Sequence, residues 1–435
     1  MEPKETPVKH GTEWSSLTRK EDWLVVWIGF TLFILTALGL LNWMPKIAAW
    51  STSIIDAFKP SDLPYYALLA VLLLALTSTA IKSMGSSLAP YWKGFPMVFL
   101  VAFVSFIIAK QQTISYYGLE YVIWALLLGL IASNLFGTPN WLKPAIKTEL
   151  FTKTGLVLLG AEILFPTIVK GGAISLLEAI ITVLTTWYFC YFLAQRTGLS
   201  KSFACIMASG VSICGVSAAI AAGGAIKGDK KEVSYTISMV LLTSVVMLIG
   251  EPVIARLLNL PSAVAGAWMG GTIDTTGAVV AAGALYSEVA MTAAAIVKLT
   301  RNMLIGVVAF MLALYWTLKV NANPEEKPKI TDIWYRFPKF IVGFITTSLI
   351  FSFILTPSLG ETRVKTITTI TEVIRGWFFS LAFVSIGLET RFRDLLEVGG
   401  KKAALVFLTS QALNIGLVYC LAWLLFGNIF FPSPI

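Results

Sequence analysis

Long apolar runs dominate this sequence and restrict its fold more than any other feature. Eleven runs carry few or no charged residues. A helix needs about 20 predominantly apolar residues to cross a bilayer, so each run is expected to span a membrane. The fold class predicted is therefore an all-α polytopic membrane protein with about 11 transmembrane helices. The runs are Leu24–Met44, Pro64–Ile81, Phe95–Ala109, Tyr117–Phe136, Leu150–Val169, Ala173–Ala194, Val233–Gly250, Val289–Leu318, Pro338–Thr356, Thr366–Leu388 and Ala403–Phe426.

The composition excludes several other classes of protein. Charged residues make up 13% of the 435 residues and apolar residues 57%, whereas about a quarter of an ordinary soluble domain is charged. A soluble multi-domain enzyme is therefore excluded. The runs also exclude an outer-membrane barrel, because its strands alternate in polarity. In a membrane protein the net charge of +9 indicates basic cytoplasmic loops, so no nucleic-acid partner is expected.

The histidine and cysteine content argues against an enzyme. His10 is the single histidine and lies in the polar N-terminal tail. The usual ligand or base of haem, zinc and Ser-His-Asp sites is therefore missing from the membrane part. The four cysteines are dispersed without CxxC spacing, which is typical of buried free thiols. We expect no catalytic residue, no metal site and no cofactor.

Two further apolar segments, 200–226 and 261–285, are crowded with small residues. Their centres read SGVSICGVSAAIAAGG and MGGTIDTTGAVVAAGA. One interpretation is a continuous helix whose small residues permit close packing. Because glycine raises the cost of a continuous helix, we favour two half-helices that meet at a break. Such a segment is either a broken span or a re-entrant hairpin.

Charge placement bears on the topology. The basic segment 227–232 (KGDKKE) follows the first interrupted segment. Because basic loops stay in the cytoplasm, this placement favours a hairpin that enters and leaves on the cytoplasmic side. The second hairpin would then enter from outside. The tail 1–22 is then cytoplasmic, residues 23–435 form one transmembrane domain, and the C-terminus is external. Thirteen full crossings would place both termini in the same way, so that alternative stays open.

Sequence echoes indicate duplicated halves. The two interrupted segments share Gly, Ile and Ala positions at an offset of 60, beginning with Gly210 and Gly270. The helices that follow them also match in part. A third echo pairs Gly160-Ala-Glu162 with Gly387-Leu-Glu389. Repeats of inverted orientation are common in secondary transporters, so we expect an inverted-repeat transporter architecture.

Asp274 lies at the centre of the second interrupted segment, beside Thr272, Thr275 and Thr276. Ionisable groups inside a bilayer are costly and mark functional sites. A carboxylate with hydroxyls and freed carbonyls suits a hard cation such as Na⁺. The alternative is a cap on a half-helix N-terminus, and the two roles are compatible. We predict Asp274 as the ion-coupling residue, with Na⁺ or H⁺ as the coupling ion.

Lys298 and Arg301 face one side of an otherwise apolar helix, because they are three residues apart. They could attract an anion, and Arg301 could bind an oxyanion through two hydrogen bonds. Alternatively, they pair with Asp274, Glu162 or Glu389 and hold the bundle together. Both are kept as candidate substrate-binding residues.

The backbone at the two breaks is the strongest candidate for an anion site. Half-helix N-termini present free N–H groups and partial positive charge. If the two breaks meet at mid-membrane, they could cradle a tetrahedral oxyanion; the alternative is close packing alone. The predicted substrate-binding residues there are Ser212, Cys214, Gly215, Ser217, Gly271, Thr272, Thr275 and Thr276.

Several motifs resemble one family of bacterial integral membrane proteins. Residues Ala265–Gly283 (AGAWMGGTIDTTGAVVAAG) and Ala293–Gly306 (AAAIVKLTRNMLIG) are similar to the YeiH-type sulfate exporter family. So are the stretch SGVSICGVSAAIAA and the Gly-Leu-Glu helix end at Glu389. The resemblance implies an exporter of an anion, sulfate by the family's name. Some members carry His in place of Asp274, which leaves the coupling ion open because His suits only a proton.

The combined expectation is a secondary active transporter of a small inorganic oxyanion, sulfate or a related sulfur oxyanion, in the inner membrane. The sequence holds no GxxxxGK[ST] motif for ATP, so an ion or anion gradient would drive alternating access. By analogy, core elements around 149–318 and 366–426 would move against a scaffold in a homodimer. The alternatives are a Na⁺- or H⁺-coupled carrier of carboxylates or sulfonates and a passive anion channel. A membrane-embedded enzyme is disfavoured.

Overall fold

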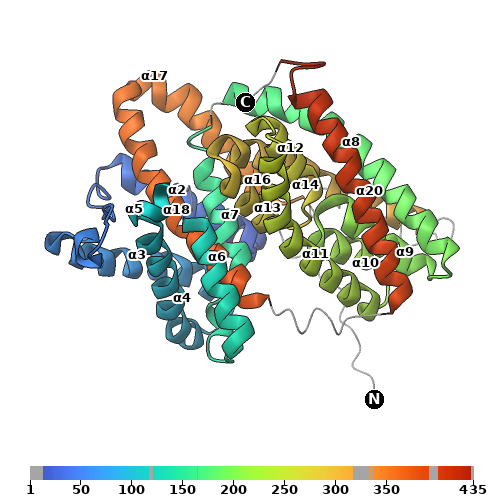
Figure 1. Cartoon of the computed structure of the whole chain (residues 1–435), viewed down its shortest axis with the longest axis horizontal. Helices are drawn as coiled ribbons and strands as arrows, with labels where there is room; N and C mark the ends of the chain where they lie inside the picture. Colours follow the sequence, from blue (N-terminus) through green and yellow to red (C-terminus); the bar gives the residue numbers. More distant parts are fainter. Residues whose placement is uncertain are drawn as a thin grey trace.

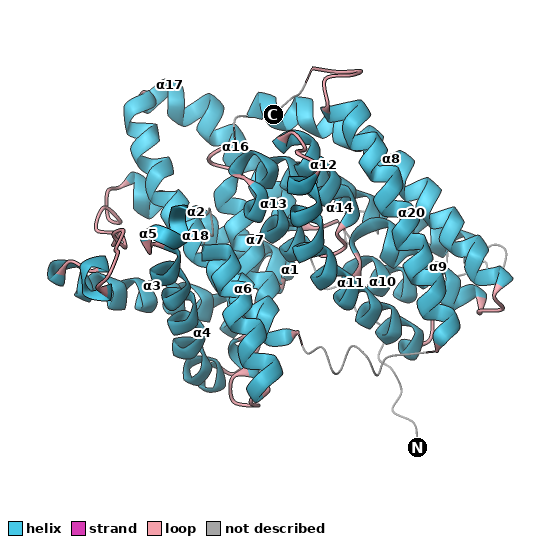
Figure 2. Cartoon of the chain, viewed as in Figure 1, coloured by secondary structure: helices cyan, strands magenta, loops and turns pink. Residues whose placement is uncertain are grey.

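The structure is a computed structural model that describes residues 13–116, 121–163, 165–316, 334, 337–390 and 400–432. Every regular element in these ranges is a helix, as Figure 2 shows. The α-helices are α1 (Glu13–Arg19), α2 (Glu21–Ala37), α3 (Leu63–Ser83), α4 (Leu88–Ala109), α5 (Gln112–Tyr116), α6 (Tyr121–Ile131), α7 (Thr148–Leu159), α8 (Phe165–Arg196), α9 (Lys201–Ser209), α10 (Val216–Ile226), α11 (Lys230–Leu257), α12 (Ser262–Thr272), α13 (Thr276–Tyr286), α14 (Glu288–Tyr315), α16 (Lys339–Leu349), α17 (Thr356–Leu359), α18 (Glu361–Glu389) and α20 (Lys401–Phe426).

Within the described residues, eight helical stretches are long and apolar enough to cross a membrane. They are α3, α4, α8, α11, α14, α16 with its continuation through α17, α18 and α20. The predicted all-α polytopic membrane fold is therefore confirmed. Three of the eleven predicted spans are shorter helices, because α2 has 17 residues, α6 has 11 and α7 has 12.

The boundary predicted between the fifth and sixth spans is wrong. The run Leu150–Val169 was expected to be one helix, but α7 ends at Leu159 and α8 begins at Phe165. Side chains from a distant segment hold the turn between them: Ser352 Oγ accepts a hydrogen bond of 2.9 Å from the Phe165 N–H. Nothing in the local sequence reports that contact. The glycine pair at 171–172 stays inside α8, where a continuous helix satisfies the backbone.

Both interrupted segments are broken helices, as predicted. The first consists of α9, a wide turn over Gly210–Cys214, and α10. Gly215, between the turn and α10, has φ 68° and ψ −108°, a conformation that side-chain-bearing residues rarely adopt. The second consists of α12 and α13, separated by the non-helical residues 273–275. The continuous-helix interpretation is therefore excluded for both.

Each broken helix turns back on itself. At the ends of the α12–α13 pair, Ser287 Oγ donates to Ser262 Oγ at 3.0 Å. At the ends of the α9–α10 pair, Ser200 and Ser202 both donate to Glu232, at 2.6 and 2.7 Å, in the first turn of α11. The two ends of each segment therefore lie together, which is the geometry of a hairpin. Because α11 connects the hairpins, both ends of the first hairpin lie near the start of α11, and the second hairpin follows the end of α11.

The helices form two groups that lie side by side in Figure 1. In one group α18 packs with α6 and α7, α4 with α6, and α2 and α16 with α7. In the other group α12, α13, α10 and α8 pack with α14, and α20 packs with α8 and α12. The groups meet where α13 contacts α7 and α18. The predicted mobile core included α7 and α18; its motion stays a prediction.

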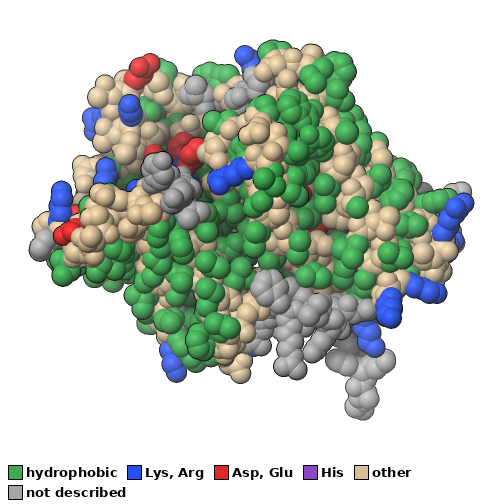
Figure 3. Space-filling view, viewed as in Figure 1, with side chains coloured by type: hydrophobic (Ala, Val, Ile, Leu, Met, Phe, Trp, Pro, Cys, Tyr) green, Lys and Arg blue, Asp and Glu red, His purple; other side chains and the backbone are tan. Residues whose placement is uncertain are grey.

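The surface suits an apolar solvent. In Figure 3, hydrophobic side chains cover much of the middle of the face shown, and most Lys and Arg side chains lie toward its edges. Many large apolar side chains are exposed, including Leu135, Phe136 and Tyr188. Extensive apolar exposure is unusual for a soluble monomer and is expected where lipid covers the protein.

Candidate functional site between the two hairpin tips

The breaks of the two hairpins meet in the interior of the second helix group. A Cβ placed on Gly215 would lie 3.1 Å from Asp274 Cβ and would clash with the Val240 side chain of α11. Glycine is therefore needed at 215 for space as well as for its φ value. The meeting of the breaks, which was a condition of the predicted anion cradle, is present in the structure.

Lys298 and Arg301 bind the backbone at the ends of the first half-helices. Lys298 Nζ donates to Ile273 O at 2.8 Å and to Ile213 O at 3.3 Å. Helix C-termini leave carbonyls unpaired and carry partial negative charge, so a buried cation compensates both. Both side chains are fully buried. Lys298 therefore joins the tips of the two hairpins.

Arg301 repeats this arrangement with three donors. Its Nε donates to Ser212 O at 2.8 Å, its Nη2 to Val211 O at 3.4 Å, and its Nη1 to Gly271 O. The alternative, in which these cations pair with Asp274, Glu162 or Glu389, is not found among the described ion pairs. Glu162 pairs with Arg375 instead, and Glu389 accepts from Thr148. Neither Lys298 nor Arg301 lines the cavity described next.

The N-termini of the second half-helices open on a cavity of about 390 Å³, here called the tip cavity. Val216 and Ser217 of α10 lie on it, together with Thr275 and Thr276 at the start of α13. Neither Gly215 nor Thr275, the N-cap residues, supplies a side-chain cap. The first turns of two helices therefore border one space, and neither N-cap residue caps them, which is an arrangement suited to an anion.

The polar lining of the tip cavity also includes Asn302, Lys153, Asp22 and Glu149. Asn302 of α14 donates to Thr276 Oγ1 at 3.2 Å, and its own Oδ1 has no partner. Lys153 of α7 is held by Glu21 at 2.8 Å and by Asp22 at 3.0 Å. Neither Asn302 nor Lys153 was among the site residues predicted from the sequence. Lys153 and Glu149 share a helix face at i, i+4, which is a signal that the sequence does contain.

A second cavity of about 380 Å³ adjoins the tip cavity. It shares Glu149, Val216 and Thr275 with it, and it extends to Ser244 of α11 and to Glu389. The two cavities therefore form one recessed region along the hairpin tips, at the meeting of the two helix groups.

The structure separates the predicted site residues into two layers. Cys214, Ser217, Thr275 and Thr276 line the tip cavity. The others do not line it and lie behind it, around the breaks and on α14, and all of them are buried; they are Ser212, Gly215, Gly271, Thr272, Asp274, Lys298 and Arg301. Asp274 Oδ2 accepts from Thr243 Oγ1 at 3.4 Å. Of the predicted residues, those in contact with the cavity thus present hydroxyls, a thiol and backbone, and the charged ones, Asp274, Lys298 and Arg301, lie behind it.

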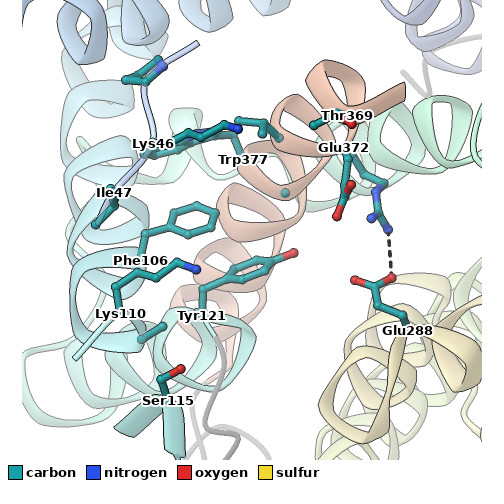
Figure 4. Close-up of a pocket in the computed structure, with 15 residues that line it drawn as sticks. Lys46, Ile47, Phe106, Lys110, Ser115, Tyr121, Glu288, Thr369, Glu372 and Trp377 are labelled. Carbon is teal, nitrogen blue, oxygen red and sulfur yellow. Dashed lines mark ion pairs between the residues drawn. The ribbon is translucent and has the colours of Figure 1, made fainter. Parts of the chain in front are cut away.

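A larger cavity of about 550 Å³ lies elsewhere, here called the Arg375 cavity. Figure 4 shows Lys46, Lys110 and Tyr121 on one side of it and Glu288 and Glu372 on the other. Glu288 begins α14, whereas Asn302 of the tip cavity lies 14 residues later on that helix. At 1.5 Å per residue this separation is about 21 Å, so the two cavities occupy different levels of the molecule.

Arg375 links helices of the two groups beside the Arg375 cavity. It forms ion pairs with Glu162, beyond the end of α7, at 3.0 Å and with Glu288 of α14 at 3.6 Å. These pairs join α18 of the first helix group to α14 of the second. The side of the groups that carries the Arg375 cavity is therefore held together, while the tip cavity opens elsewhere.

Comparison with known proteins places the chain in a family. Residues 93–406 match the family described as Conserved hypothetical protein 698. A UPF0324 membrane protein of Rhodopirellula baltica is 39% identical, over 90% of this chain and 73% of that protein. One from Nitratidesulfovibrio vulgaris is 38% identical over 80% of this chain but only 62% of its own length. One from Nitrosomonas europaea is 30% identical over 94% and 96%. No solved structure matches. The chain belongs to the UPF0324 membrane protein family.

Proposed function

We propose that this protein is a secondary transporter that moves a small inorganic oxyanion across the cytoplasmic membrane by alternating access. The observation that carries the proposal is the pair of half-helix N-termini, of α10 and α13, that border the tip cavity and whose N-cap residues supply no side-chain cap. Hairpin tips with exposed N-termini are a common way for transporters to hold anionic groups inside a membrane. Lys298 and Arg301, buried on the opposite side of the breaks, add positive charge near these N-termini.

The repeat pattern supports the inverted architecture. Glu389, at the end of α18, accepts from Thr148 at the start of α7, and Glu162, just beyond the end of α7, pairs with Arg375 of α18. The start of α7 thus contacts the end of α18, and the end of α7 contacts an earlier turn of α18, so the two helices are antiparallel. Glu162 and Glu389 are the matched residues of the third sequence echo. Eleven crossings result if α2, α6 and α7 also span, with one hairpin entering from each side of the membrane.

The basic residues support an orientation. Lys227, Lys230 and Lys231 lie where the first hairpin ends and α11 begins. The positive-inside rule places this end in the cytoplasm. Asp22, at the start of α2, lines the tip cavity, which then faces the cytoplasm, whereas the Arg375 cavity faces outward behind its ion pairs. The N-terminus is then cytoplasmic and the C-terminus external.

The substrate is proposed from the chemistry of the cavity and from the sequence resemblance. Uncapped N–H groups and hydroxyls suit the oxygens of a tetrahedral anion, and the YeiH-type motifs favour sulfate or a related sulfur oxyanion. A cation coupled through Asp274 would supply the driving force. A homodimer, by analogy with other transporters, is part of the proposal, with the second copy of the chain as the partner.

Uptake into proteoliposomes tests the proposed function. We expect saturable uptake of labelled sulfate, sulfite or thiosulfate by the wild-type protein. Thr276→Val removes a hydroxyl from the tip cavity, and a lost hydrogen bond to a charged group costs about 1.5 kcal/mol. The KM should therefore rise about tenfold with little change in maximal rate.

Thr369→Val, in the Arg375 cavity, is the matched control and should behave as wild type. Equal effects of the two valine variants would contradict the tip cavity as the binding site. Uptake of carboxylates or sulfonates alone would replace the substrate class. Flux that does not saturate would indicate a channel.

A further inference from the structure

Three buried carboxyl groups lie behind the hairpin tips, and the sequence motifs draw attention to only one of them. Asp274 lies at the second break, Glu251 in α11 and Glu178 in α8, with 0, 3 and 1% of their surfaces exposed. None of them belongs to an ion pair of the described residues. Glu251 Oε1, Asp274 Oδ1 and both oxygens of Glu178 have no hydrogen-bond partner. Buried carboxylates with unpaired oxygens are costly, so the protonation states of these three carboxyl groups require an explanation.

Hydrogen counting at Glu251 indicates an acid that carries a proton. Thr272 Oγ1 lies 2.6 Å from Trp268 O and 2.7 Å from Glu251 Oε2. The hydroxyl has one hydrogen, the Trp268 carbonyl can only accept, and donation to the carbonyl four residues earlier is a common use of a helical threonine. Both short contacts are satisfied together only when Glu251 supplies the second hydrogen.

Asp274 has a similar environment. Thr243 Oγ1 lies 3.0 Å from Met239 O, 3.1 Å from Val240 O and 3.4 Å from Asp274 Oδ2. Again one hydroxyl hydrogen is shared between carbonyls and a carboxyl oxygen. Glu251 and Asp274 also lie close enough to interact electrostatically, so ionising one opposes ionising the other.

The charges around the pair also favour a proton. The facing cations are Lys298 and Arg301 of α14, both already bound to backbone carbonyls. Glu178 faces the same region from α8, because a Cβ on Gly271 would collide with its Oε1. Three acids against two bases leave one negative charge unless a proton neutralises it. From α20, Gln411 donates to Thr272 O at 2.9 Å and keeps its Oε1 unpaired.

We propose that Glu251, together with Asp274, is the binding site of the coupling proton. This inference rests on the proposed transport function and names the coupling ion as H⁺. The proton exchanges between Glu251, Asp274 and water without any bond to the anion. Ser244, next to Thr243 on α11, lines the cavity that adjoins the tip cavity, so this cavity extends to within one residue of the Thr243–Asp274 contact.

The relative direction of proton and anion transport follows from the coupling between their binding sites. A proton at Glu251 removes a negative charge from behind the N-termini that hold the anion, so it favours anion binding. The anion favours protonation by the same factor, because coupling is reciprocal. Proton and anion should therefore move in the same direction, and an inward proton gradient should drive anion uptake.

The proton site can be tested without a known substrate, by infrared titration of the protein in liposomes. The carboxylic C=O absorption should disappear as pH rises, and Glu251→Gln should lose part of it at every pH. The introduced carboxamide can donate to Thr272 as a protonated acid does, so this variant should fold. Glu251→Asp should restore a titrating absorption at shifted frequency. The matched control, Glu178→Gln, should keep the Glu251 absorption.

Two results would overturn the proton site: an unchanged titration in Glu251→Gln, or loss of the absorption on adding Na⁺ at constant pH. The flux assay then separates the two proposals. If the wild type is active, Glu251→Gln should retain exchange of anion for anion. Its uptake driven by a pH gradient should fall at least tenfold. Absence of any wild-type oxyanion flux would count against the proposed function and leave the infrared result standing.

Discussion

Arg301→Gln should destabilise the protein more than any other single change to a charged residue at the hairpin tips. The substitution removes the guanidinium contacts to Ser212 O and Gly271 O and leaves carbonyls of both hairpins without a donor. Loss of a buried charged partner costs about 3–5 kcal/mol. In a protein of this size we expect the melting temperature in detergent to fall by about 3–5 °C.

The comparison variants for Arg301 distinguish a structural role from substrate binding. Arg301→Lys keeps the charge but not the three-donor geometry and should fall between the wild type and Arg301→Gln. Lys201→Gln removes an exposed cation at the start of α9 and should leave the melting temperature unchanged. If Arg301→Gln melts as the wild type does but fails to transport, Arg301 contacts the substrate and the carbonyl-binding role is wrong.

Gly215→Ala should have the second largest effect, on both stability and transport. The φ of 68° with ψ of −108° strains any residue with a side chain, by about 1–3 kcal/mol. The added methyl also collides with Val240 and approaches Asp274. We therefore expect a lower melting temperature and loss of most transport, measured in the same detergent and proteoliposome preparations.

Gly224→Ala is the matched control for Gly215→Ala. Gly224 lies in α10, has ordinary helical backbone, and nothing lies within 4 Å of a Cβ placed on it. Alanine there should leave stability unchanged or raise it by up to about 1 kcal/mol. Gly215→Ala/Val240→Ala removes the collision but not the strain, so it should recover only part of the loss. Full activity in Gly215→Ala alone would show that the break does not need its present geometry.

The apolar runs and small residues predicted much of the fold, because both act locally. A run of about 20 apolar residues forms a helix in lipid wherever it lies in the chain. Clustered glycines likewise mark a break. The end of α7 was not predictable, because Ser352, far along the chain, holds the turn before α8. Whether the broken helices cross or return also depended on contacts such as Ser262 with Ser287.

The site was predictable in part for the same reason. Cys214, Ser217, Thr275 and Thr276 follow from the position of the breaks and line the tip cavity. The partners of Lys298 and Arg301 did not follow, because a sequence does not show that backbone carbonyls will meet a buried cation. Glu251 was not among the predicted site residues, because a proline such as Pro252 commonly ends a helix, whereas α11 continues through Pro252 to Leu257.

Substrate protection of a single cysteine in the tip cavity tests the central claim most directly. The four native cysteines are replaced, and Ser217→Cys or Lys201→Cys is introduced. Ser217 is exposed and lines the tip cavity, whereas Lys201 is exposed outside it. The alkylation rate by a small water-soluble maleimide is then measured against the concentration of the transported oxyanion. We expect saturable protection of the thiol in Ser217→Cys and no protection of the thiol in Lys201→Cys. An alkylation rate at position 217 that does not depend on an anion whose transport this cysteine variant supports would contradict the tip cavity as its binding site.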